Sequence, residues 1–194
     1  QLAASIDWPQ GHADGRVPLV IVVHGLTGQR IGKSYHLVEF ARRLNDRGIA
    51  CLRFDQRGCG ESTGRFVDLT IQSMVEDLNA VRAWADEQRW CDADRSGFVG
   101  LSLGALPVVA SEARRHASAI ALWAPVYDMP RVFNLTARSG LRALVEHQGW
   151  VPYRGLRIGA DFINTLDAVD TPAALARGRA PLLLCHSRHD DIVP

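Results

Sequence analysis

The feature that most constrains the fold is a serine with a glycine two residues away on each side, Gly100-Leu101-Ser102-Leu103-Gly104. It joins an apolar run at 96–101, which predicts a strand, to a helical pattern at 103–115. A sharp turn from strand to helix leaves no room for side chains at the flanking positions, and glycine meets that requirement. The serine hydroxyl would then stand above the sheet, at a helix N-terminus that favours developing negative charge. Taken alone, the pattern also fits an ordinary glycine-flanked serine at a strand–helix turn.

The rest of the chain alternates strand-like and helix-like patterns. Strands are predicted at 2–6, 17–23, 49–54, 96–101, 119–123 and 181–185, and helices at 33–47, 70–90, 103–115 and 141–147. Strands separated by helices predict crossover connections, and therefore an α/β fold with a mainly parallel sheet and helices on both faces. Residues 126–178 are too many for a simple connection, and we interpret them as a crossover helix plus a small insertion. This insertion is either a lid or an ordinary structural excursion.

Composition narrows the class of partners. The 194 residues predict one domain, and 22 Lys and Arg against 21 Asp and Glu give no reason to expect nucleic acid or a membrane. Four scattered cysteines lack zinc-site spacing, so we expect no metal and no cofactor. Cys51 and Cys185 lie in apolar runs and are predicted to be small buried thiols, which favours a reduced, cytoplasmic setting. The chain starts at Gln1 and stops after a strand–loop pattern, so we expect it to be incomplete at both ends.

A second glycine-containing turn follows the strand at 17–23. Its sequence is His24-Gly25-Leu26-Thr27-Gly28. Acyl transfer needs two N–H donors for the oxyanion, and the candidates are the backbone N–H groups of Leu26 and Leu103. His24 precedes the turn and is interpreted as structural rather than as a catalytic base.

Four segments together carry a family resemblance: HGLTG at 24–28, DQRGCGES at 55–62, GLSLG at 100–104 and HSRHDDIVP at 186–194. In this order and at these spacings the chain resembles α/β-hydrolases, in particular the serine aminopeptidase-like or hydrolase 4 branch that includes feruloyl and cinnamoyl carboxylesterases. The resemblance covers nearly the whole chain except about residues 126–178. It implies fold and catalytic class, and no particular substrate.

The resemblance also implies roles for individual residues. The 55–58 loop is expected to be structural, bracing the floor of the cleft. Alignment of the last motif makes Asp190 the acid of a catalytic triad, with Asp191 as the nearest competitor and Asp128 as an outside alternative. The acid would orient a histidine and stabilise its imidazolium form.

The histidine itself is missing. In the family it lies one strand beyond the acid, and no histidine follows Asp190 here. Without a base Ser102 is a poor nucleophile, so we predict a C-terminally truncated, nearly inactive segment that lacks the last strand and helix. The longer parent is predicted to cleave small carboxylic esters through an acyl-enzyme on Ser102. The alternatives are a serine peptidase or amidase, an acyltransferase or thioesterase, and a non-catalytic binding protein of the same fold.

Overall fold

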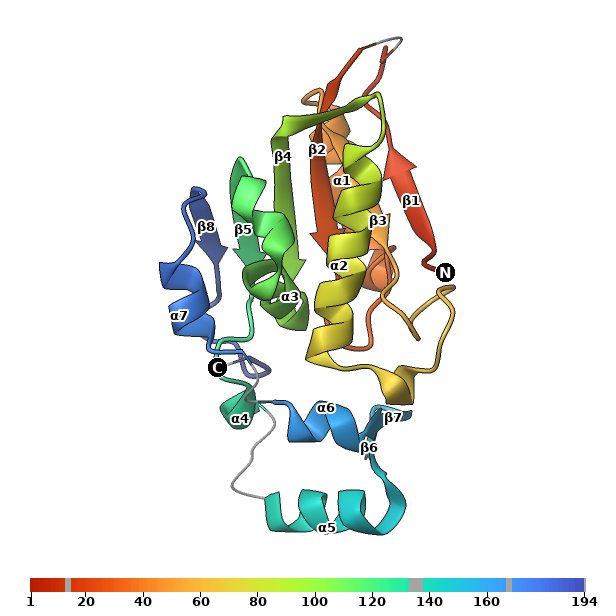
Figure 1. Ribbon diagram of the computed structural model, residues 1–194, viewed down its shortest axis with the longest axis vertical. Helices are drawn as coiled ribbons and strands as arrows, with labels where there is room; N and C mark the ends of the chain where they lie inside the picture. The colour runs from red at the N-terminus through yellow and green to blue at the C-terminus, as the bar shows by residue number, and fades with distance from the viewer. Residues whose placement is uncertain (13–14, 133–137, 167–168, 194) are drawn as a thin grey trace.

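A six-stranded sheet forms the centre of the computed structural model, which describes residues 1–12, 15–132, 138–166 and 169–193 (Figure 1). The strand order is β1-β3-β2-β4-β5-β8, and only β1 runs antiparallel to its neighbour. The strands are β1 (Ala4–Asp7), β2 (Val17–Val23), β3 (Ala50–Phe54), β4 (Cys91–Leu101), β5 (Ala119–Trp123) and β8 (Leu182–Cys185). The predicted α/β class with a mainly parallel sheet is confirmed.

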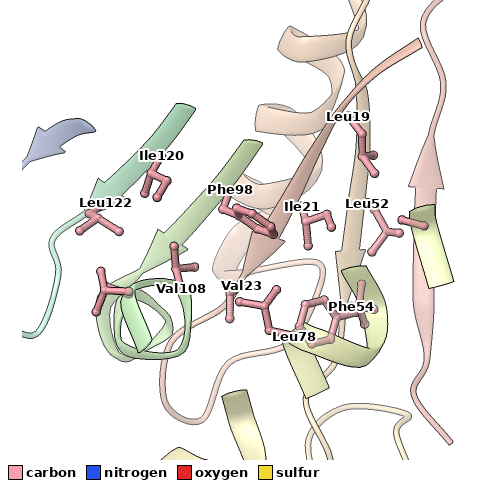
Figure 2. Packing of buried hydrophobic residues seen from close by; sticks show 14 of the residues in the cluster. Leu19, Ile21, Val23, Leu52, Phe54, Leu78, Phe98, Val108, Ile120 and Leu122 are labelled. Atoms are coloured by element: carbon pink, nitrogen blue, oxygen red, sulfur yellow. The ribbon is translucent and has the colours of Figure 1, made fainter. Parts of the chain in front are cut away.

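Helices cover both faces of this sheet. On one face α1 (His36–Asn45) buries Leu37 and Ala41 against β2, β3 and β4. The other face carries α2 (Ile71–Asp86), α3 (Ala105–Ala110) and α7 (Thr171–Ala176). Figure 2 shows the main core on this second face, where strand side chains such as Ile21, Phe54 and Phe98 meet Leu78 of α2 and Val108 of α3.

Several predicted boundaries were wrong. Strand β4 begins at Cys91 rather than at 96, because its first residues pair with the start of β2 before a register shift between Pro18 and Leu19. Helix α2 starts with a capping box at Thr70 and already ends at Asp86.

The predicted helix 103–115 is broken into three pieces. They are the 3-10 turn η3 (Ser102–Gly104), α3 (Ala105–Ala110) and the 3-10 helix η4 (Glu112–His116). Between α3 and η4, Ser111 is extended, and the N–H of Ala113 donates to the side chain of Asn79 on α2 instead of continuing the helix. A side chain of α2 therefore takes one of the bonds that a continuous helix would have made.

Between β5 and α7 the chain forms a separate group of small elements. These are α4 (Met129–Val132), α5 (Arg138–Gln148), an antiparallel hairpin of β6 (Trp150–Tyr153) and β7 (Leu156–Gly159), and α6 (Ala160–Asn164). The hairpin was not predicted. The hairpin packs closely on the 3-10 turn η2 (Phe66–Asp68). A Cβ atom on Gly159 would clash with the carbonyl oxygen of Val67. Whether the group acts as a lid stays a prediction.

Strand β8 is an edge strand with unusually open side chains. Leu182, Leu183, Leu184 and Cys185 are all exposed. The prediction of a buried thiol is correct for Cys51 and wrong for Cys185, because an apolar run was taken as evidence of burial on both faces. Within the described ranges, none of the helices is both long and apolar enough to span a bilayer.

Candidate active site

Ser102 lies at the sharp turn that its sequence predicts. It follows β4 directly and has a φ of 53°, a left-handed conformation that is uncommon for residues with a side chain. A Cβ atom on Gly100 would come within 2.7 Å of the Cα atom of Ala105, and one on Gly104 within 2.5 Å of the carbonyl oxygen of His24. Both flanking positions therefore require glycine. The surrounding backbone holds Ser102 in a strained conformation, as is common at functional sites.

The turn after β2 lies against this serine. A Cβ atom on Gly25 would be 3.0 Å from Cβ and 3.5 Å from Oγ of Ser102. The turn is closed by the N–H of Gly28, which donates to the carbonyl of Gly25 at 3.0 Å. The N–H of Leu26 makes no hydrogen bond within the described parts of the chain. A free backbone donor is thus carried on a turn in contact with Ser102, which is what an oxyanion site needs.

His24 has both ring nitrogens occupied. The N–H of Gln56 donates to Nε2 at 3.1 Å, so Nδ1 carries the proton and donates to the carbonyl of Gly25 at 2.8 Å. The side-chain amide of Gln56 also donates to the His24 carbonyl at 2.9 Å. Burial lowers the pKa of His24, which favours the neutral ring. The histidine therefore braces the end of β2, in agreement with its structural interpretation.

The loop after β3 braces the same region from the other side. Asp55 is fully buried and accepts hydrogen bonds from the backbone N–H of Arg30, at 2.6 Å, and from its guanidinium. It also accepts the N–H of Glu61 at 3.0 Å. Farther along, Arg57 forms an ion pair with Asp77 of α2 at 2.7 Å. These contacts tie the loop to neighbouring segments, as expected for a structural element.

Asp190 lies in the loop after β8, and its carboxylate accepts hydrogen bonds from the backbone of that loop. Its Oδ1 accepts the N–H groups of Ile192 at 2.9 Å and of Val193 at 2.8 Å, and these bonds lower its pKa. Oδ2 lies 3.7 Å from Nε2 of His186, whose proton goes to the carbonyl of Val193 at 2.7 Å. Asp191 and Asp128 are exposed. Asp190 is therefore held ionised in a closed loop, and its assignment as the triad acid stays a prediction.

The loops that carry Ser102 and Asp190 share one edge of the sheet. They follow β4 and β8, which are parallel strands on either side of β5. Val193 and Leu103 belong to the same buried apolar cluster, and the N–H of Val126 donates to the carbonyl of Ser102 at 3.2 Å. This packing links the loop after β8, which carries Asp190, to the segment after β5 and to the turn at Ser102.

A cavity of about 580 Å³ opens beside the loop that follows β8. Its lining comes from α3, α7 and the segments that follow β5 and β8, and includes Tyr127, His186 and Asp190. Ser102 is not part of this lining. No side chain of the described ranges hydrogen-bonds to its Oγ, so these residues present a serine without an imidazole base.

A family model described as "Serine aminopeptidase, S33" (Hydrolase_4) matches residues 16–154. The chain belongs to this family. The match contains both the serine turn and the turn after β2, which are the two parts of the site in direct contact. The resemblance expected from the sequence motifs is thereby confirmed.

Relatives of this S33 family chain include one named esterase and one uncharacterized protein. It is 31% identical to Esterase YjfP of Escherichia coli (strain K12) over 115 residues, 55% of this chain and 44% of the relative. It is 34% identical over 113 residues to an uncharacterized 31.7 kDa protein of E. coli, covering 58% of this chain and 38% of the relative. The chain thus spans less than half the length of these relatives.

Among solved structures, Est1E from Butyrivibrio proteoclasticus with bound ferulic acid superposes with a TM-score of 0.85 at 25% identity. The superposition covers 100% of this chain and 77% of Est1E. Together with the family match, this superposition supports the α/β-hydrolase fold.

Proposed function

We propose that Ser102 is the nucleophile of a serine esterase that cleaves small carboxylic esters. The observation that carries this proposal is the contact between two strained glycine turns: Ser102, at a φ of 53°, has Gly25 against its Cβ and Oγ. Backbone strain of this kind costs stability and is common at active sites. The arrangement is suited to a hydroxyl that attacks a carbonyl beside two backbone N–H donors.

The proposed reaction is acyl transfer in two steps. Ser102 Oγ attacks the ester carbonyl while a histidine takes its proton, and the same histidine returns the proton to the leaving alcohol. The N–H groups of Leu26 and Leu103 stabilise the oxyanion, and water then hydrolyses the acyl-enzyme. Asp190 orients the histidine through Oδ2, since Oδ1 already accepts two backbone N–H groups.

The histidine is proposed to come from residues beyond 194, because His24 is fully engaged and no described side chain hydrogen-bonds to Ser102 Oγ. The 194 residues alone are then nearly inactive. The lack of a histidine bonded to Ser102 among the described residues also fits one rival function, that of a binding protein that kept the fold and lost the catalytic activity. A peptidase, an amidase, an acyltransferase or a thioesterase would share the same nucleophile.

The test compares Asp190→Asn with Asp191→Asn in the longer protein, using a panel of short acyl esters, hydroxycinnamate esters and aminoacyl anilides. Loss of the triad carboxylate lowers kcat by about 10⁴-fold where it has been measured in a serine protease. We expect a loss of this order for Asp190→Asn and less than about threefold for Asp191→Asn, since Asp191 is exposed. Equal losses would contradict the assignment of the acid. Hydrolysis of anilides but not of esters would favour a peptidase.

A further inference from the structure

A second cavity lies on the face of the sheet covered by α2, α3 and α7. Its volume is about 730 Å³, within the range of small-molecule sites, and neither Ser102 nor Asp190 contributes to its lining. The lining comes from the start of α2, the end of α3, the η4 turn, and the chain before and after α7. Nothing in the proposed esterase chemistry uses this cavity.

Arginines dominate its charged lining. Arg114 and Arg115 come from η4, and Arg177 and Arg179 from the turn after α7. Arg115 forms an ion pair with Glu112 at 2.5 Å. The other three guanidinium groups make no ion pair and no hydrogen bond with any residue of the described ranges.

Two of these unpaired arginines, Arg114 and Arg177, lie close together. A Cβ atom on Gly178 would lie 3.2 Å from a guanidinium nitrogen of Arg114, so this guanidinium rests on the turn between Arg177 and Arg179. Burial and the nearby charge of Arg177 lower the pKa of Arg114, because both disfavour its charged form. A bound anion would relieve this repulsion.

The charge balance indicates which kind of anion fits. Among the described residues, four arginines and two carboxylates, Glu112 and Asp170, line the cavity and leave a charge of +2. Asp170 is already used to cap α7, where its Oδ1 accepts the N–H of Ala173 at 2.9 Å. A phosphate dianion balances the remaining charge, and the planar fork of arginine matches phosphate oxygens in paired hydrogen bonds.

The remaining wall of the cavity is largely apolar. Ile71 and Val75 of α2, Val109 of α3, and Val169 all contribute to it. We propose that this cavity binds an organic phosphate, with the phosphoryl group at Arg114, Arg177 and Arg179 and an apolar body against α2 and α3. The ligand binds on a different surface from the proposed catalytic site.

Calorimetric titration with phenyl phosphate and with inorganic phosphate, at constant ionic strength, tests this proposal. The double variant Arg114→Gln/Arg177→Gln is expected to bind both at least tenfold more weakly. Arg43→Gln serves as the matched control, because Arg43 is an exposed arginine on α1, on the other face of the sheet. It should bind like the parent chain. Thermal unfolding without ligand checks that each variant is folded.

A second variant separates the two ends of the cavity. Val75→Phe narrows the apolar wall and is expected to weaken phenyl phosphate at least tenfold while inorganic phosphate binds within about twofold. Equal weakening by Arg43→Gln, or unchanged binding to the double arginine variant, would overturn the proposal. So would binding to phosphatidic acid vesicles that phenyl phosphate fails to displace, since the arginines would then serve a lipid surface.

Discussion

Replacement of Gly104 by alanine tests whether the serine turn is as tightly packed as its geometry indicates. The new Cβ atom would lie 2.5 Å from the carbonyl oxygen of His24 and closer still to that of Val23. Both oxygens belong to the buried end of β2, so relief requires backbone movement rather than a change of rotamer. Overpacking that forces side chains and backbone to shift costs about 1–3 kcal/mol. The upper end of this range applies here, because the backbone itself must move.

Part of this cost is recovered, because Gly104 has helical φ and ψ and alanine is favoured over glycine in a helix by about 1 kcal/mol. The net loss is about 2 kcal/mol, which corresponds to a decrease in Tm of about 4–8 °C for a domain of this size. Thermal unfolding followed by far-UV circular dichroism, with urea unfolding alongside, measures it.

Gly48→Ala is the control for backbone strain without a clash. Gly48 has a φ of 75°, and a Cβ atom there would meet nothing within 4 Å. Its expected cost is the left-handed penalty alone, about 1 kcal/mol. If Gly104→Ala were no less stable than Gly48→Ala, the close approach of the serine turn to β2 would be refuted.

Three further predictions follow from the same contacts. Ser102→Gly relieves a left-handed penalty of about 1–2 kcal/mol against an entropic cost of about 0.5–1 kcal/mol, a net gain of about 0–1.5 kcal/mol, so Tm should stay level or rise by up to about 6 °C; a lower Tm would argue against strain at this residue. His24 has a lowered pKa in the folded state, so the unfolded chain binds more protons below about pH 6.5 and stability falls there. Urea unfolding at about pH 7.5 and 5.5 should therefore show a smaller pH-dependent loss in His24→Gln than in the parent, and equal losses would contradict this. In the native state Cys185 should react with a maleimide within minutes, whereas Cys51, buried and with its pKa raised to about 12, should react only on unfolding; mass spectrometry of the labelled peptides distinguishes the two.

The sheet could be predicted from the sequence because its strands are short, apolar and punctuated by glycine-rich turns. The 17–23 run became β2 with the expected bounds, and 119–123 became β5. The turn at Ser102 could be predicted equally well, because a left-handed serine between two close-packed positions requires glycine at both. A steric requirement that involves only neighbouring residues can therefore be recognised as a short sequence motif.

Features that depend on distant partners could not be read in this way. The break at Ser111 is accompanied by a hydrogen bond from the N–H of Ala113 to the side-chain oxygen of Asn79, more than 30 residues earlier. The β6–β7 hairpin has only four residues in each strand, too few for a clear alternation. Exposure of Cys185 reflects the place of β8 at the edge of the sheet that the described residues form, which no pattern within 181–185 can reveal. The arginine cavity likewise assembles residues from α2, η4 and the α7–β8 turn.

Labelling with a fluorophosphonate probe tests whether Ser102 is the activated nucleophile that we propose. The comparison uses the longer protein, the 194-residue chain and the Ser102→Ala variant of the longer protein. We expect rapid labelling of the longer protein, slow labelling of the 194 residues alone and no labelling of Ser102→Ala. Absence of labelling in the longer protein, or labelling that survives Ser102→Ala, would contradict this proposal.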